Sequence, residues 1–504
     1  MRTAPDYSAF AEIYEGGTAQ VVWTSIVADL ETPVSAMLKL AAGQPNSFLL
    51  ESVEGGAARG RYSIIGLEPD LIWRCRGDAA EINRTALTGL DGFEPCDKDA
   101  LSSLRELVEE SRIDLPESLP PMAAGLVGYL GYDTVALMEK IPSTRPDPID
   151  VPDGLFLRPT IMVVFDTVKD TITIVTPVRP IADRPAGAAY EAAAERLSRV
   201  IQSLDNPLPH DAVATAEQLE TPQPVSNTRE ADYLAMVQRA KEYIYAGDIF
   251  QVVLSQRFKV PFTLPPISLY RALRRTNPSP FLFFLNFGDF SVVGSSPEIL
   301  VRVRDNRVAI RPLAGTRPRG ETSAADAALA EDLLSDKKEL AEHLMLLDLG
   351  RNDVGRVAKI GTVEVTEKMI VERYSHVMHI VSNVEGDLDT QNHDAIDALI
   401  GGFPAGTVSG APKIRAMEII DELEAEKRGV YAGTVGYFSA NGSMDTCIVL
   451  RTALVKDGTM YVQSGAGIVA DSDPAAEHRE CQNKALALIR AAEEAIRYAG
   501  ERGN

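Results

Sequence analysis

Cysteine is scarce in this 504-residue sequence and follows no metal-binding or disulfide pattern. The four cysteines, Cys75, Cys96, Cys447 and Cys481, form no C-x-x-C pair, so the sequence predicts neither a zinc site nor a disulfide framework. No apolar run approaches the roughly 18 residues of a membrane-spanning helix, and residues 1–6 lack the apolar core of a signal peptide. We therefore expect a protein of the cytoplasm, a reducing compartment, with no membrane attachment.

Positive charge is also in short supply. The chain holds 50 Lys and Arg against 72 Asp and Glu, which gives a formal net charge of −22. A surface of this sign is repelled by nucleic-acid backbones and anionic lipids, so we expect neither as a general partner. A small anionic substrate is not excluded, because a few Arg side chains and a divalent cation can override the overall field locally.

Strand-like segments come in runs and do not alternate strictly with helices. Residues 434–465 are predicted as an antiparallel meander in which residues 445–455 form one strand. Such runs favour an α+β fold with antiparallel sheets. Four prolines and few apolar anchors between residues 205 and 228 predict a domain boundary there, and thus units 1–225 and 226–504; the alternative is a long surface loop.

A glycine-rich segment, FPAGTVSGAPK at residues 403–413, precedes a predicted helix at residues 414–424. Ser409 is predicted as the N-cap of this helix, with Pro412 close to its first turn. The free N–H groups of a first turn favour an anion, and glycine lets backbone approach a ligand closely. The segment therefore predicts an anion-binding loop, with an ordinary strand-to-helix turn as the alternative.

Two predicted helices carry acidic residues three positions apart. Glu339 and Glu342 share one face of a helix predicted over residues 324–349, and Glu477 and Glu480 do the same in the closing helix. Carboxylates from separate elements suit Mg²⁺, which prefers hard oxygen ligands and keeps several waters. Two solvated helix faces are the alternative interpretation.

Three other signals are weaker. His376 and His379 lie three apart on a predicted strand and so face opposite sides, which makes them a poor metal pair. Residues 464–470, SGAGIVA, match G-x-G-x-x-A, but no helix begins inside the motif; we reject a dinucleotide site and retain a small backbone site for a carboxylate. Arg451 ends an apolar stretch and should meet an anion, either a ligand or a buried carboxylate.

Ordered motifs across residues 230–490 are similar to those of the anthranilate synthase large-subunit family, within the chorismate-utilising enzymes. These motifs are GSSPE (294–298), PLAGTRPRG (312–320), DKKELAEH (336–343), RND (351–353), VMH (377–379), GTVSGAPK (406–413) and GAG (465–467). LLES (49–52) and PSPF (278–281) resemble the family's tryptophan feedback site. The resemblance implies the family's fold, with large antiparallel β-sheets packed as a sandwich and helices outside.

The resemblance also implies a reaction and roles for individual residues. Chorismate and ammonia would give aminodeoxyisochorismate, which loses pyruvate to give anthranilate. Glu298 would be the general acid, His379 would assist pyruvate elimination, and Thr407 would line the ring pocket. Substrate-binding positions are implied at Gly315, Thr316, Tyr431, Arg451, Gly465, Ala466 and Gly467. Mg²⁺ would be held by Glu342 and Glu480, with Glu477 nearby.

Two positions separate this chain from other chorismate enzymes. Members that add water carry Lys where this chain has Gln251, and aminodeoxychorismate synthases carry a nucleophilic Lys where it has Ala314. Tryptophan inhibition is implied at Glu51, Ser52, Pro280, Phe281 and Leu282. We expect free ammonia or a separate glutamine amidotransferase subunit, in a heterotetramer, as the nitrogen source; the alternatives are aminodeoxychorismate synthase or another chorismate enzyme, and a non-catalytic tryptophan-sensing subunit.

Overall fold

Antiparallel strands from both halves of the chain form one hydrogen-bonded network in the computed structural model, which describes all residues except 1, 42, 55–57, 210–222, 375–376 and 502–504. Within this part of the chain 22 strands are connected, and their pairings are antiparallel. The predicted α+β class with antiparallel sheets is therefore confirmed.

The strands run as follows: β1 Gln20–Val27, β2 Ser47–Glu54, β3 Ala58–Arg76, β4 Ala79–Asn83, β5 Glu94–Pro95, β6 Gly125–Leu130, β7 Gly154–Asp166, β8 Thr171–Val178, β9 Val225–Ser226, β10 Gln251–Pro261, β11 Phe281–Asn286, β12 Phe290–Ser296, β13 Ile299–Arg304, β14 Arg307–Ile310, β15 Leu313–Pro318, β16 Glu364–Arg373, β17 Val377–Asp387, β18 Gly410–Ala411, β19 Thr434–Ser439, β20 Met444–Ile448, β21 Thr452–Lys456 and β22 Thr459–Ile468.

The helices are α1 Tyr7–Glu15, α2 Pro33–Ala41, α3 Ala100–Glu110, α4 Ala186–Asp205, α5 Glu230–Ala246, α6 Pro266–Thr276, α7 Ser323–Ser335, α8 Lys337–Gly355, α9 Ala395–Gly402, α10 Lys413–Leu423 and α11 Pro474–Glu501, with the short 3₁₀ turns η1 Pro121–Ala123, η2 Tyr132–Leu137 and η4 Gly406–Val408. No helix in the described ranges is both long and apolar enough to cross a membrane.

Strands of the first half of the chain pair directly with strands of the second. β11 lies between β2 and β12, with Glu51 opposite Leu282 and Ser52 opposite Phe281. β19 likewise lies between β6 and β20. The buried side chains that pack on the network therefore come from both halves. The division at residue 225 stays a prediction, and much of the segment on which it rests, residues 210–222, lies outside the described residues.

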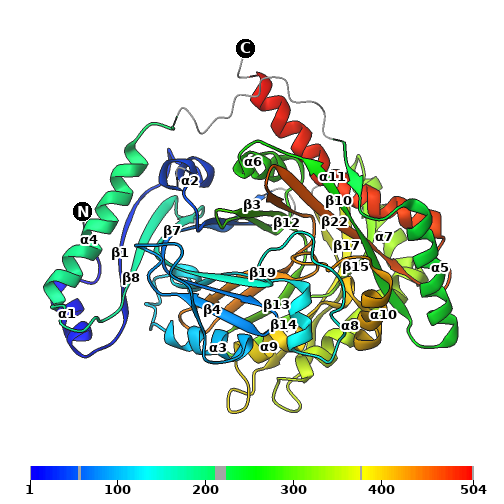
Figure 1. Cartoon of the computed structure of the whole chain (residues 1–504), viewed down its shortest axis with the longest axis horizontal. Helices are drawn as coiled ribbons and strands as arrows, with labels where there is room; N and C mark the ends of the chain where they lie inside the picture. The colour runs from blue at the N-terminus through cyan, green and yellow to red at the C-terminus, as the bar shows by residue number, and fades with distance from the viewer. Residues whose placement is uncertain (1, 42, 55–57, 210–222, 375–376, 502–504) are drawn as a thin grey trace.

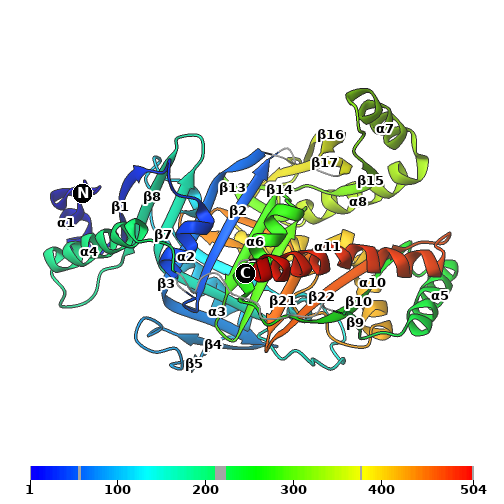
Figure 2. The ribbon, with the colours of Figure 1, turned by 90° about the horizontal axis from the view of Figure 1, so that it is seen from above.

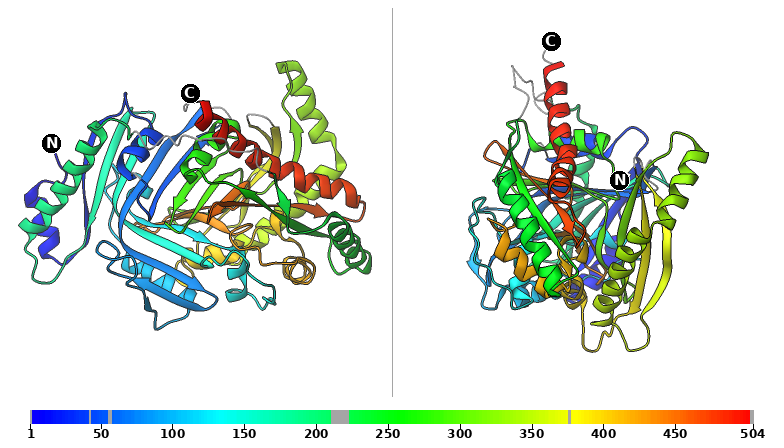
Figure 3. Two further views of the ribbon diagram at one scale, coloured as in Figure 1. Left: turned by 45° about the horizontal axis from the view of Figure 1, so that its top comes forward. Right: turned by 90° about the vertical axis from the view of Figure 1, so that its right-hand side faces the viewer.

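Helices cover the outside of this network (Figure 1). α1 and α4 pack beside β1 and β8 at one end of the molecule, and α11 crosses β22 at the other (Figure 3). Two groups of elements lie side by side in Figure 2: α7 and α8 with β15, β16 and β17, and α5, α10 and α11 with β10 and β22. The predicted acidic residues come from one helix of each group.

Two predicted elements are divided in the structure. The helix predicted over residues 324–349 is α7 and α8, which meet at Asp336; the Asp336 carboxylate caps α8 by accepting from the backbone N–H groups of Lys338 and Glu339. The strand predicted over residues 445–455 is β20 and β21, because Arg451 between them has a φ of 48°, which a strand cannot accommodate.

The prediction that Ser409 caps a helix is wrong. Pro412 is the N-cap residue of α10, and Ser409 Oγ donates to the carbonyl oxygen of Ala405 at 2.8 Å. The reason is a long-range pairing: β18 lies against Gln251 and Val252 of β10, so the chain is still extended there. The segment is nevertheless closely packed, because a Cβ at Gly410 would lie 2.2 Å from the carbonyl oxygen of Gln251.

Candidate active site

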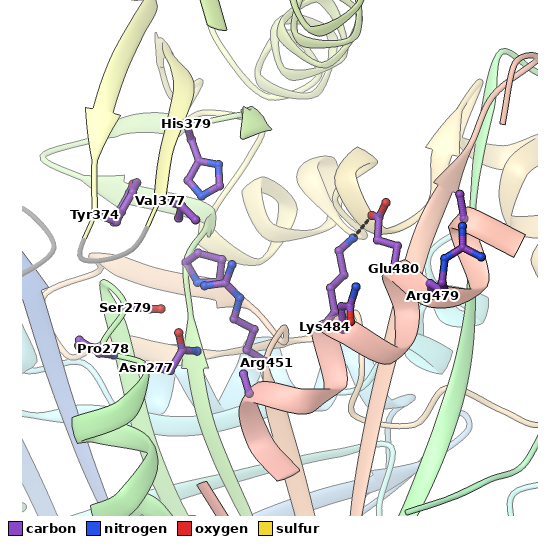
Figure 4. Close-up of a pocket in the computed structure, with 14 residues that line it drawn as sticks. Asn277, Pro278, Ser279, Tyr374, Val377, His379, Arg451, Arg479, Glu480 and Lys484 are labelled. Carbon is purple, nitrogen blue, oxygen red and sulfur yellow. Dashed lines mark ion pairs between the residues drawn. The ribbon is translucent and has the colours of Figure 1, made fainter. Parts of the chain in front are cut away.

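A cavity of about 530 Å³ lies where the two groups of elements face each other. Its walls come from the segment before β11, from Tyr374 and β17, from the β20–β21 junction and from α11 (Figure 4). The lining residues are Asn277, Pro278, Ser279, Pro297, Tyr374, Val377, His379, Arg451, Ala476, Arg479, Glu480, Asn483, Lys484 and Ala487. Figure 4 shows His379 above Arg451, with Glu480 and Lys484 opposite on α11.

Glu298 lies between β12 and β13, directly after the cavity residue Pro297. It is 6% exposed, and burial raises the pKa of its carboxyl to about 8, against the opposing effects of the nearby Thr407 hydroxyl and the Leu313 backbone. Thr407 Oγ1 is itself buried and has no well-formed hydrogen bond within the described chain. The pair thus offers a carboxyl that holds its proton at neutral pH, with the Thr407 hydroxyl beside it.

His379 of β17 is held by one ring nitrogen. Its Nδ1 lies 2.9 Å from the carbonyl oxygen of Gly315 and 3.1 Å from Thr316 Oγ1. A carbonyl only accepts, so Nδ1 carries the proton and Nε2 is left as an acceptor. Burial lowers the pKa of His379 to about 4, which keeps the ring neutral. His376, expected from the sequence to be a poor metal pair with His379, lies outside the described residues.

Gly315 owes its role to a β-bulge. The register of β15 against β17 shifts between Ala314 and Thr316, and Gly315 at the shift has a φ of 73°. Such a bulge turns the Gly315 carbonyl toward His379, which explains why this position needs glycine. Ala314 pairs with Ile380 and is buried.

Arg451 reaches the cavity from the break between β20 and β21. Burial lowers the pKa of its guanidinium, and it makes no ion pair with any described residue. Of the two partners that the sequence left open, a buried carboxylate is therefore not supported within this part of the chain. An uncompensated Arg in a cavity is a binding point for an anionic ligand.

Residues 464–468 of the predicted backbone site at residues 464–470 belong to β22, and residues 469 and 470 follow it. Gly465, Ala466 and Gly467 pair with Ser255, Leu254 and Val253 of β10. On its other edge β22 pairs with β21 only as far as Val462, so no described strand covers this edge beyond Val462. Tyr431 adjoins the same stretch, because a Cβ at Gly465 would lie 2.9 Å from the Tyr431 hydroxyl.

The acidic residues form two pairs on facing helices. Gln251 Nε2 donates to Glu342 Oε1 of α8 at 3.2 Å, and a Cβ at Gly467 would lie 2.6 Å from the same nitrogen. Lys484 of α11 pairs with Glu480 at 2.7 Å and donates to the Gly465 carbonyl at 2.9 Å. Glu342 and Glu480 thus connect through Gln251 and Lys484 to the same short stretch of β22.

The chemistry of these donors fits Mg²⁺, which takes carboxylate oxygens and water. Burial raises the pKa of Glu477, and the neighbouring Glu480 raises it further; burial and the neighbouring Glu342 do the same for Glu339. Mutual repulsion of this kind is relieved by a cation. The ligands are not preassembled, since no three His, Cys, Asp or Glu residues in the described ranges come together as a metal cluster.

The residues assigned to tryptophan inhibition gather around the β2–β11 pairing, where Pro280 leads into Phe281 and Leu282. Glu51 is buried and accepts hydrogen bonds from Tyr270 at 2.5 Å, Ser63 at 3.4 Å and both Nε and a terminal nitrogen of Arg274. Four donors fill the lone pairs of this carboxylate. Ser52 is half-buried and donates to the Tyr62 carbonyl at 3.2 Å.

Several cavity residues were not among the predicted site residues: Asn277, Ser279, Tyr374, Arg479, Asn483 and Lys484. Lys484 could have been inferred, because it follows Glu480 by four positions and lies on the same helix face. Tyr374 gave no local signal; its place beside Glu298 and Arg451 depends on how β16 and β17 pair.

The sheet network and this cavity are those of a chorismate-utilising enzyme, as a comparison with known families shows. A family model described as chorismate binding enzyme matches residues 46–490, so the chain belongs to that family. Among known proteins it is similar to anthranilate synthase component 1 of Cereibacter sphaeroides, with 57% identity over 498 residues and 99% of each chain covered. The resemblance to the anthranilate synthase large-subunit family is therefore confirmed.

Solved structures of similar proteins agree with this family assignment. Anthranilate synthase component I from Streptococcus pneumoniae superposes with a TM-score of 0.76 and 38% identity, over 92% of this chain and 99% of that one. The menaquinone-specific isochorismate synthase MenF from Escherichia coli, at 21% identity and a TM-score of 0.69 over 97% and 100% of the two chains, shares the fold.

Proposed function

We propose that this chain converts chorismate and ammonia into anthranilate, pyruvate and water. The observation that carries the proposal is Glu298, a buried carboxyl with a pKa of about 8 that lies beside the Thr407 hydroxyl and directly after the cavity residue Pro297. A group that is protonated at neutral pH and removed from water can donate its proton to a departing hydroxyl. The similarity to anthranilate synthase component 1 supports the choice of reaction.

In the first step ammonia adds to C2 of the ring while the 4-hydroxyl leaves as water, which gives aminodeoxyisochorismate. Glu298 supplies the proton that the departing oxygen needs, since hydroxide is a far poorer leaving group than water. Arg451 binds the carboxylate of the enolpyruvyl side chain, with Tyr431 and the uncovered edge of β22 beside it. Thr407, Gly315 and Thr316 line the ring.

In the second step the bond between C3 of the ring and the enolpyruvyl oxygen breaks, and the ring becomes aromatic by losing its proton at C2. The methylene carbon of the leaving group gains one proton, so the group leaves as pyruvate. His379 is suited to take up that proton, because it is neutral and its Nδ1 is fixed by Gly315 and Thr316. Nε2 is then left as the acceptor.

Mg²⁺ would be held by Glu342 and Glu480, with Glu477 close by. When bound, it would neutralise the ring carboxylate and draw electron density from the ring. Gln251 donates a hydrogen bond to Glu342, and Lys484 forms an ion pair with Glu480.

Ammonia is the proposed nucleophile because Gln251, which lies beside Gly467, cannot act as a base. An amide neither accepts a proton from water nor attacks the ring, whereas ammonia needs no deprotonation to react. Ala314 likewise has no nucleophile to offer for amination at C4. The name component 1 of its relatives supports a second component as partner, which we propose to be a glutamine amidotransferase that supplies ammonia.

A direct test mixes the purified chain with chorismate, ammonium and Mg²⁺ and follows anthranilate by its fluorescence. We expect anthranilate and pyruvate in equal amounts. A 4-aminobenzoate precursor would indicate an aminodeoxychorismate synthase, and a complete lack of turnover would favour a non-catalytic sensing subunit.

Tryptophan is the proposed inhibitor, bound beside the β2–β11 pairing. Because Glu51 already accepts from four donors, we assign it the task of holding Tyr270 and Arg274 of α6 against β2. Ser52, with Pro280, Phe281 and Leu282, would then contact the inhibitor.

A further inference from the structure

An unpartnered amide lies on the cavity wall next to Arg451. Asn277 Nδ2 is buried and has no hydrogen-bond partner among the described residues, although Asn277 lines the cavity. A buried donor without an acceptor is unfavourable, and native structures retain few of them. Neither the motifs nor the proposed chemistry uses this side chain.

One buried serine fixes Asn277 and Arg451 relative to each other. Ser295 Oγ donates to the carbonyl oxygen of Asn277 at 2.5 Å, and the Ser295 backbone N–H donates to the carbonyl oxygen of Arg451 at 3.1 Å. Ser295 has no exposed surface, so both hydrogen bonds are made by one fully buried residue. The two side chains therefore belong to one corner of the cavity, as Figure 4 shows.

The backbone of Asn277 is held on its other side as well. Its N–H donates to the Leu273 carbonyl at 2.8 Å, which ends α6, and Pro278 follows with a fixed φ. Ser279, two residues on, is 3% exposed and also lines the cavity. The backbone of Asn277 is thus held on two sides, while Nδ2 has no hydrogen-bond partner among the described residues.

We propose that Asn277 Nδ2 donates a hydrogen bond to the same ligand carboxylate that Arg451 binds, and so helps to select a substrate that carries an enolpyruvyl carboxylate. This inference rests on the proposed function, because it takes chorismate as the substrate. A neutral donor beside a guanidinium suits a carboxylate, which can accept from both on different lone pairs. Asn277 is thereby a specificity-determining residue in addition to the predicted set.

Asn277→Ala and Asn277→Asp test the proposal, with Asn306→Asp in the exposed β13–β14 turn as a charge-matched control. Loss of a charge-assisted hydrogen bond should lower kcat/KM for chorismate roughly 10- to 100-fold, mainly through KM. Asn277→Asp should lower it further, because a carboxylate beside Arg451 competes with the substrate. The Asn306→Asp control should have the same kcat/KM for chorismate as the parent protein. The Tm of both Asn277 variants should stay close to the parental value.

Unchanged kcat/KM in both Asn277 variants would overturn the proposal. So would a failure of both variants to fold, since a side chain without a bond in the fold should not be needed for folding. If the parent protein showed no turnover at all, the proposed function would fail instead. Calorimetric binding of chorismate would then still compare Asn277→Ala with the parent, and equal affinity would refute the carboxylate contact.

Discussion

A single carboxyl, Glu298, combines a functional role with a cost in stability. Burial raises its pKa from 4.5 to about 8, so between these values the folded chain keeps a proton that the unfolded chain releases. The folded state then binds more protons, and its stability falls as the pH rises from 4.5 toward 8. A residue kept in spite of this penalty is typical of a catalytic position.

Glu298→Gln should separate the two effects. We expect kcat to fall roughly 10²- to 10⁴-fold, because the amide cannot supply a proton. We also expect a higher Tm at pH 8, since the amide never ionises. Parental activity should itself decline as the pH rises through about 8, where Glu298 loses its proton. Anthranilate assays and thermal unfolding across this pH range provide the measurement; full activity of the variant would refute the assignment.

The choice of nucleophile is predicted to depend on Gln251. Gln251→Lys places an amine where the amide now donates to Glu342, and in neutral form that amine can take a proton from water. We expect part of the product to become isochorismate-like, seen by chromatography of reactions with limiting ammonium. Detection of aminated products alone would count against a role of this residue in selecting ammonia.

At the scale of elements, one buried ion pair joins the parts that carry the site. Arg428 binds Glu424 through two nitrogens and donates to the carbonyl oxygens of Val408 in η4 and Val253 in β10, each at 2.7 Å. Glu424 in turn accepts from the backbone and hydroxyl of Ser255. Removing one partner of such a pair leaves an uncompensated charge in the interior.

Arg428→Gln should therefore destabilise the protein by about 3–5 kcal/mol. It should also reduce activity in the folded fraction, because η4 carries Thr407. Denaturant unfolding measures the first effect and kcat the second, with Arg229→Gln at an exposed position as the control. Parental stability in Arg428→Gln would show that the pair is dispensable.

The position of Ser52 in the β2–β11 pairing leads to a prediction about inhibition by tryptophan. Ser52→Ala removes a hydroxyl next to Phe281 without disturbing the four bonds to Glu51. We expect weaker inhibition by tryptophan, with catalysis in its absence unchanged. Inhibition curves for the variant and the parent test this, and superimposable curves would remove Ser52 from the effector site.

Local patterns predicted most elements and failed where distant parts of the chain decide the outcome. The strand at residues 434–439 and the closing helix emerged from periodicity and turn signals. The extended stretch at Gly410 did not, because it depends on β10, more than 150 positions earlier in the chain. The break at Asp336 was readable, since Asp336 followed by Glu339 is a helix-start signal.

The same distinction applies to the site. Motif residues such as Glu298 and His379 were found through resemblance, and their pKa values depend on burial that no local pattern reports. Asn277 shows the limit most clearly. The residues next to Asn277 in sequence do not predict that its amide nitrogen is buried without a partner. Its burial depends on how α6, β12 and the β20–β21 break meet in the fold.

At the scale of the whole molecule, the pairings of β2 with β11 and of β6 with β19 predict a single cooperative unfolding transition. Trp23 and Trp73 both lie in residues 1–225, whereas the proposed catalytic residues lie after residue 225. Tryptophan fluorescence and enzymatic activity should therefore be lost at the same denaturant concentration. Separate midpoints would show that the two halves unfold independently and would support the predicted division at residue 225.

The interleaving of strands also limits how this protein can be recombined with its relatives. A chimaera joined at residue 225 would pair β2 from one parent with β11 from the other, and likewise β6 with β19. Side chains in these two strand pairings would then contact residues with which they did not evolve. Exchange of segments between relatives is better tolerated when both strands of each pairing come from one parent. Drift in one half of the gene is thus constrained by the other half.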